Sequence, residues 1–337
     1  MPPARGVPSM IKAFLVVTAL ILAVVLFGLV KIRFFPVEVD ESAFHEPAGE
    51  DLSPLVDHVA ELSRRIGSRS VYEYGKLEEA KAYIAGTIRS QGGTPEFQRY
   101  AYNGKTYSNI VVTRPGGKEA DSWIVVGAHY DTVLGTPGAD DNGSAVAVLL
   151  EMARILGAEI FDRTVKLVFF TLEEPPVFRS EFMGSFVFAR EVRRRGQDIR
   201  AMICLEMLGF FGDEKGKQSF PLPLMSLFYP STPDFIAVVG NLASRKLVRT
   251  VGEILGRNSP VPVETLSAPS VVPGIDFSDH RSFWKMGYPA VMITDTAFYR
   301  NPYYHTSRDT LEKLDFCRMA QLVPGLVAVV RELAGAE

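Results

Sequence analysis

WIVVGAHYDTVLGTPGADDNGS, the sequence from Trp123 to Ser144, carries the clearest structural signal in the chain. It begins with a continuous apolar run, which predicts a strand buried on both faces of a sheet. His129 and Asp131 follow this strand, and a loop rich in glycine and proline leads to an Asp-Asp pair. An apolar helix is expected from Ser144 to Leu156. The segment is therefore a strand–loop–helix unit with polar side chains after its strand.

Strands and helices alternate on both sides of this unit. Further strands are expected at residues 108–113, 165–172, 201–207, 234–239 and 290–294. Further helices are expected at residues 55–66, 76–90, 185–195, 243–255 and 311–334. This order predicts an α/β domain with a mostly parallel sheet and helices on both faces. Ligands of such sheets bind at the carboxyl ends of the strands.

Composition excludes several classes of protein. The chain has 337 residues, of which 47% are hydrophobic and 22% charged, as in ordinary globular proteins. Its formal net charge of −3 gives no electrostatic reason to expect a nucleic-acid partner. Only two cysteines are present, which excludes a disulfide scaffold and a cysteine-rich zinc module.

The N-terminal region differs from the rest. After a tail of residues 1–12, residues 13–33 hold an uncharged apolar run long enough to span about 27 Å as a helix, close to the bilayer core of roughly 30 Å. This predicts a single transmembrane anchor, followed by a proline-containing linker at residues 34–54 and a domain at residues 55–337. A cleaved signal peptide and a buried helix are the alternatives. The flanking charges are balanced, so our expectation of an extracytoplasmic domain rests on the usual role of a lone N-terminal anchor.

Histidines and carboxylates recur after the expected strands, and each has a structural explanation when taken alone, such as a turn or a helix cap. The candidates are His129, Asp131, Asp140, Asp141, Glu173, Glu174, Glu206 and His305. Gathered at one sheet edge, these carboxylates would repel one another without a cation. Nitrogen and oxygen ligands without cysteine suit an open, catalytic zinc site.

These motifs resemble those of the dinuclear-zinc aminopeptidase family, which also includes glutamate carboxypeptidase II, the transferrin receptor ectodomain and the glutaminyl cyclases. The matching stretches are GAHYDTV, PGADDNGSA, the Glu-Glu pair, ICLEMLGF, SDHRSFW, GYPAVMITDT and YYHTSRDT. The resemblance covers residue 55 to the C-terminus. It implies a three-layer α/β/α sandwich with a mostly parallel mixed sheet, and a zinc exopeptidase, most simply an aminopeptidase, acting on a peptide or small amide.

The resemblance also implies a ligand set for two Zn²⁺ ions. His129 and Glu174 would bind the first ion, Glu206 and His305 the second, and Asp140 would bridge both. The family more often has aspartate where this chain has Glu206. The family also typically has a cis peptide at the position of Asp140–Asp141.

Three further residues receive roles in the same way. Glu173 would be the general base that takes a proton from the attacking water. Asp131 would accept a hydrogen bond from the His129 ring. Tyr304 would donate to the developing oxyanion. Two alternatives stay open: a glutaminyl cyclase-like acyltransferase with one zinc on the same fold, and a non-catalytic receptor-like ectodomain.

Overall fold

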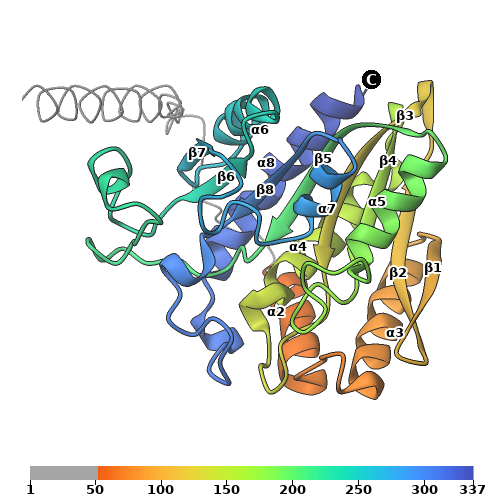
Figure 1. The fold of residues 1–337 in the computed structure, drawn as a ribbon, viewed down its shortest axis with the longest axis horizontal. Coiled ribbons are helices and arrows are strands. Elements are labelled where there is room, and N and C mark those ends of the chain that lie inside the picture. The colour runs from red at the N-terminus through yellow and green to blue at the C-terminus, as the bar shows by residue number, and fades with distance from the viewer. Residues whose placement is uncertain (1–51, 337) are drawn as a thin grey trace, which may run out of the picture. The chain divides into compact units, whose positions relative to one another are not determined.

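A mixed sheet of eight strands runs through residues 52–336, the part of the chain that the computed structural model describes (Figure 1). The strands lie in the order β1 (Pro95–Tyr102), β2 (Lys105–Arg114), β4 (Phe161–Phe170), β3 (Gly116–His129), β5 (Asp198–Glu206), β8 (Ala290–Thr294), β6 (Ile236–Gly240) and β7 (Val263–Ser267). The four central strands β4, β3, β5 and β8 are parallel, whereas β2, β6 and β7 run in the opposite direction.

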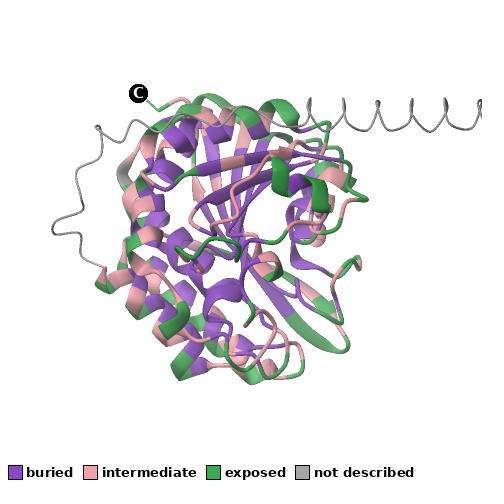
Figure 2. Ribbon diagram, turned by 90° about the vertical axis from the view of Figure 1, so that its left-hand side faces the viewer, coloured by how far each residue is buried: buried purple, intermediate pink, exposed green. Residues whose placement is uncertain are grey.

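Helices cover both faces of the sheet, which confirms the layered α/β prediction. The helices are α2 (Ser53–Ala60), α3 (Tyr74–Ser90), α4 (Ala145–Ile155), α5 (Gly184–Arg194), α6 (Arg245–Asn258), α7 (His280–Lys285) and α8 (Phe316–Ala334). The larger core joins α2, α3, α4, α6 and α8 to one face of the sheet. The smaller core joins α5 and α7 to the other face. Figure 2 shows the buried residues concentrated in the strands between these layers.

Burial on both faces explains the apolar runs that predicted the central strands. In β3, Ile124 and Val126 pack into the larger core, and Val125 between them packs into the smaller one. Successive side chains of a strand point to opposite faces, so a stretch of strand that is buried on both faces carries apolar residues in succession.

The elements that the sequence analysis missed are edge strands and a short helix. β1 is at one edge of the sheet and half-exposed along its length, and its sequence PEFQRYAY lacks an apolar run. β7 is at the other edge and has only five residues. α7 has six residues, too few to show a helical period.

The predicted anchor at residues 13–33 and nearly all of the predicted linker lie outside the described residues. Among the helices of residues 52–336, none combines the length and the apolar character needed to cross a bilayer.

Candidate metal centre

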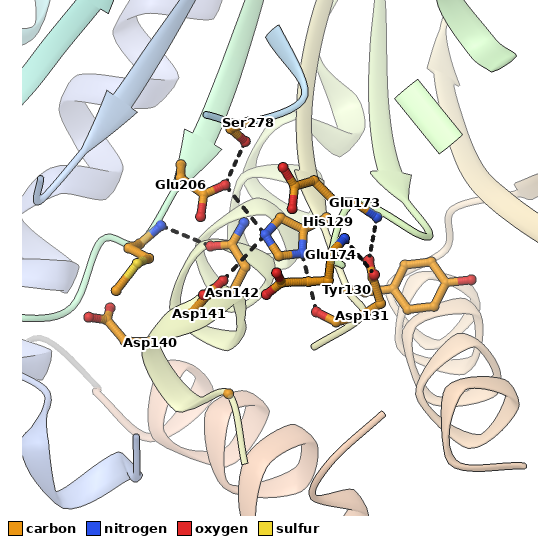
Figure 3. A network of polar contacts seen from close by, with 12 residues as sticks. His129, Tyr130, Asp131, Asp140, Asp141, Asn142, Glu173, Glu174, Glu206 and Ser278 are labelled. Atoms are coloured by element: carbon orange, nitrogen blue, oxygen red, sulfur yellow. Dashed lines mark hydrogen bonds and ion pairs between the residues drawn. The ribbon is translucent and has the colours of Figure 1, made fainter. Parts of the chain in front are cut away.

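The carboxyl ends of three parallel strands build the site. β3 ends at His129, β5 ends at Glu206, and the chain reaches Glu173 and Glu174 just after β4 ends. Because β4, β3 and β5 are neighbours, these ends meet at one edge of the sheet (Figure 3). Two loops complete the site: residues 137–144 before α4, and residues 300–310 before α8.

Asp141 lies between the two histidines. Its Oδ1 is 3.4 Å from Nε2 of His129, and its Oδ2 is 3.1 Å from Nε2 of His305. The two imidazoles therefore meet at a single carboxylate, as a bridged pair of cations requires. The central expectation of the sequence analysis, that these two histidines converge, is thus met by the geometry.

Each imidazole also faces one glutamate. Nε2 of His129 is 3.4 Å from Oε2 of Glu206, and Nε2 of His305 is 3.2 Å from Oε2 of Glu174. His129, Asp141 and Glu174 each offer a ligand atom within 4.8 Å of the others. The ion-pair distances define two triads that share Asp141, one with His129 and Glu206 and one with His305 and Glu174. The group within 4.8 Å takes its histidine from the first triad and its glutamate from the second, so the two triads adjoin.

Asp140, the predicted bridge, points elsewhere, so this part of the prediction is wrong (Figure 3). Its carboxylate accepts hydrogen bonds from the backbone N–H of Gly209 at 3.0 Å and from Nδ2 of Asn301 at 2.8 Å. Neighbouring side chains of this turn project in different directions, and only that of Asp141 faces the histidines. The cis peptide is likewise one residue later than expected, at Asp141–Asn142.

The pairing of the glutamates is also opposite to the expectation. The sequence analysis grouped Glu174 with His129 and Glu206 with His305. β3 and β5 pair with Gly127 beside Cys204, so two residues further along His129 lies beside Glu206. Strand order, which the sequence did not reveal, therefore decides which carboxylate each histidine meets.

The electrostatics of the site favour a cation. Burial raises the pKa of Glu206, and burial together with Asp141 raises the pKa of Glu174 to about 8. Burial alone would lower the pKa of His305, but Asp141 and Glu174 outweigh it and raise that pKa to about 10. Oδ1 of Asp141, Oε1 of Glu174 and Nε2 of His305 are buried without a hydrogen-bond partner in the described structure.

Such a set of inward-facing nitrogen and oxygen atoms fits zinc. A cation would offset the cost of burying several carboxylates together and would use the atoms that lack a hydrogen bond. The residues present therefore match the metal that the ligand types suggested.

Asp131 orients the site, but not only in the predicted way. The Nδ1 atom of His129 is 3.2 Å from the backbone oxygen of Asp131 and 3.6 Å from its carboxylate. That carboxylate accepts hydrogen bonds from the backbone N–H groups of Glu173 at 3.0 Å and Glu174 at 3.1 Å. Asp131 thus ties the end of β3 to the chain that follows β4.

Glu173 and Tyr304 are each next in sequence to a residue of the two triads, Glu174 and His305. Glu173 is buried, and within the described chain it forms no ion pair with either histidine. Burial raises its pKa well above the usual range of a glutamate. The ring of Tyr304 stacks on that of His305 with centroids 3.7 Å apart. Burial raises the pKa of Tyr304, so its hydroxyl keeps its proton at neutral pH.

Three supporting residues escaped the sequence analysis. Asn142 accepts a hydrogen bond from the N–H of Met207 and donates to the oxygen of Leu205, which holds the backbone on both sides of Glu206. Ser278 donates to Oε2 of Glu206 at 2.6 Å. Asp309 binds two backbone amides of the 137–144 loop. All three lie within quoted motifs, but their roles follow from contacts that only the fold creates.

An apolar pocket opens beside Glu206 and Tyr304. It is partly open to solvent. Strands β6 and β8 line one side through Ala237, Val239 and Met292, and the connection between β5 and β6 supplies Phe220 and Met225. Apolar pockets with a few polar groups at one end are typical of small-ligand sites.

Fold and site together define an α/β metallohydrolase. Comparison with known proteins gives the family: the model of peptidase family M28 matches residues 109–323. The chain therefore belongs to peptidase family M28, as its resemblance to the dinuclear-zinc aminopeptidases implied, and is a zinc metallo-exopeptidase.

Relatives agree with this membership. The uncharacterized protein YfbL of Escherichia coli (strain K12) is 40% identical over 277 residues, which cover 80% of this chain and 84% of that protein. Leucine aminopeptidase 1 of Pyrenophora teres f. teres is 28% identical over 244 residues, 68% of this chain and 56% of the fungal protein. The chain thus spans little more than half of this fungal relative.

Solved structures share the fold at low identity. BSAP, a zinc aminopeptidase from Bacillus subtilis, has a TM-score of 0.65 at 16% identity and covers 86% of this chain and 96% of its own. Glutaminyl cyclase of Porphyromonas gingivalis has a TM-score of 0.61 at 19% identity and covers 84% of this chain and 98% of its own. Fold likeness alone thus includes both an aminopeptidase and a cyclase.

Proposed function

We propose that this protein is a membrane-anchored aminopeptidase that holds two zinc ions and removes the N-terminal residue of peptides. The observation that carries this proposal is the position of Asp141, with one carboxylate oxygen 3.4 Å from His129 and the other 3.1 Å from His305. His129, Asp141 and Glu206 would hold one ion, and His305, Asp141 and Glu174 the other. The names of the fungal and bacterial relatives agree with this activity.

The chain's own residues supply the proton transfers. Zinc, when bound, polarises the scissile carbonyl and makes water a better nucleophile at neutral pH. A Glu173 carboxylate oxygen takes a proton from the attacking water and later delivers it to the leaving amine nitrogen. The hydroxyl of Tyr304 donates a hydrogen bond to the oxygen that gains negative charge. Asp131 holds Glu173 and Glu174 in place through their backbone amides.

The apolar pocket would receive the side chain of the N-terminal residue. It begins at Glu206 and Tyr304 and is lined by aliphatic and aromatic side chains. Burial of an apolar substrate side chain there would strengthen binding by about 25 cal/mol per Å² removed from water. The proposed preference is therefore for large apolar N-terminal residues.

Substitutions that change the pocket volume test this preference. Ala237→Leu fills part of the pocket and is expected to lower kcat/KM for leucyl and phenylalanyl anilides about 10-fold, because a methylene in such a pocket discriminates by that order. Alanyl anilide is the internal control and should be hydrolysed nearly as before. Met225→Ala enlarges the pocket and should shift the preference toward larger side chains. Equal effects on all three substrates would remove the pocket from side-chain recognition.

Membrane attachment is a separate part of the proposal. The predicted anchor at residues 13–33, with its apolar run at residues 13–30, would hold the chain in the membrane, and the peptidase domain would lie on the extracytoplasmic side. Accessibility of the domain to added protease in spheroplasts, which lack an outer barrier to the protease, compared with lysed cells, tests this orientation. Protection in spheroplasts would place the domain in the cytoplasm.

The activity itself is tested on the full-length chain purified in detergent. We expect hydrolysis of aminoacyl anilides with a free amino group, none of the N-acetylated substrates, loss of activity with a chelator and its return with zinc. Metal analysis should find about two zinc ions per chain. Hydrolysis of N-blocked peptides from the carboxyl end would make the protein a carboxypeptidase. One zinc with cyclisation of glutaminyl peptides would favour the cyclase.

A further inference from the structure

Arg69 is a fully buried arginine that connects two segments of the site. Its Nε donates to the backbone oxygen of Tyr130 at 2.7 Å, the residue after His129. Its Nη1 and Nη2 donate to the oxygens of Pro137 at 2.7 Å and Gly138 at 2.9 Å, in the loop that carries Asp141. One planar group thus fixes the distance between the chain at His129 and the chain before Asp141.

The turn at Gly138 makes this arrangement possible. Its φ of +63° is rarely adopted by residues with a side chain, and a Cβ there would lie 2.3 Å from Cγ2 of Thr132. In this conformation the Gly138 oxygen accepts from both Arg69 and the N–H of Gly143, the latter at 3.2 Å. The loop is therefore held on both sides of the Asp pair.

Asp309 connects the same loop to the segment of His305. Its Oδ1 accepts from the N–H of Asp140 at 2.9 Å, and its Oδ2 accepts from the N–H of Asp141 at 3.1 Å. Its backbone oxygen accepts from the N–H of Ala139 at 3.3 Å. Asp309 is fully buried and lies four residues after His305, so its contacts set where Asp141 stands relative to that histidine.

We propose that Arg69 and Asp309 are positioning residues that hold Asp141 midway between His129 and His305 and thereby determine the zinc affinity of the site. Neither side chain is among the proposed ligands; both act through the backbone that carries Asp141. This inference rests on the metal site of the proposed function. It predicts that changing either residue weakens zinc binding beyond any general loss of stability.

The decisive variant is Asp309→Asn in the full-length chain in detergent. Asparagine keeps the size of the side chain but offers only one acceptor oxygen, so one of the two loop amides loses its partner. Zinc affinity, measured by competition with a chelating dye, is expected to fall about 10-fold for at least one ion. The visible spectrum of the cobalt-loaded variant should change, because it reports ligand geometry, and kcat should fall more than KM changes.

Asp315→Asn is the matched control. Asp315 also accepts a backbone N–H, that of Arg318 at 2.9 Å, but it does so at the start of α8. The same chemical change there should leave zinc affinity and the cobalt spectrum unaltered. Unfolding midpoints of both variants in chelator report stability apart from metal binding.

Arg69→Lys tests the second residue. Lysine keeps the charge, but one ammonium cannot reach the oxygens of Tyr130, Pro137 and Gly138 together, so zinc affinity should again fall about 10-fold. Wild-type zinc affinity and cobalt spectrum in the Asp309→Asn or Arg69→Lys chain would overturn the proposal for that residue, as would failure of Arg69→Lys to fold, which would make Arg69 a structural residue. Absence of zinc binding in the wild type would instead overturn the proposed function, and this inference with it.

Discussion

Glu173→Gln is expected to keep its full zinc content and to lower kcat for aminoacyl anilides by about 10² to 10⁴-fold, the range typical of lost general acid–base catalysis. Glutamine has the size of glutamate but cannot accept and return a proton. Glu173 makes no ion pair with His129 or His305 in the described chain, so its replacement leaves the proposed ligands intact. Zinc analysis and steady-state kinetics on the same sample measure both effects.

Glu181→Gln is a suitable control for this experiment. Glu181 is an exposed glutamate eight residues further along, paired with Arg190 at 2.9 Å. Exposed ion pairs contribute little to stability, so this variant should have the zinc content and kcat of the wild type. A wild-type kcat in Glu173→Gln would show that another group carries the proton.

Asp141→Asn is expected to reduce zinc to at most one ion per chain and to abolish most activity, whereas Asp140→Asn should keep both ions. The two residues are adjacent and buried, and each substitution replaces one carboxylate oxygen by an amide nitrogen. Each variant is therefore the control for the other. Asp141 faces both imidazoles, but Asp140 binds Gly209 and Asn301. Metal analysis after dialysis against limiting zinc measures the difference.

Asp140→Asn should instead affect stability. The new asparagine side chain would have one acceptor oxygen fewer for the Gly209 N–H or the Asn301 amide. The free energy of unfolding is therefore expected to fall by about 1–3 kcal/mol, the usual penalty for a buried unsatisfied group. Denaturant unfolding measured in chelator reports this cost. If Asp140→Asn lost zinc and Asp141→Asn kept it, the assignment first made from the sequence would be restored.

The architecture could be predicted from the sequence because burial requires apolar residues, and these form recognisable patterns along the chain. The central strands contain continuous apolar runs, such as residues 124–128 in β3, where both faces of the sheet are covered. β1 has no apolar run that would predict it, because an edge strand needs only one apolar face. The candidate residues also follow predicted strands or recognisable motifs, and the five residues of the two triads, His129, Asp141, Glu174, Glu206 and His305, are all among them.

The finer geometry was not accessible in the same way. Choosing between Asp140 and Asp141 requires the direction of each side chain in a tight loop, which Asp309 and Arg69 fix from far away in the sequence. Pairing His129 with Glu206 requires knowing that β3 and β5 are neighbours. Both the side-chain directions and the strand order depend on long-range contacts, which cannot be read from a single sequence.

Asp131, Asn142 and Asp309 all bind main-chain groups beside the proposed ligands. The protein's own hydrogen bonds thus hold these loops, and we expect the loops to keep their shape when the ion is removed. A chelated sample is expected to keep its circular dichroism spectrum and to regain activity within the time of mixing when zinc returns. The amount of working enzyme would then follow the local supply of zinc, with no refolding between the idle and the active form.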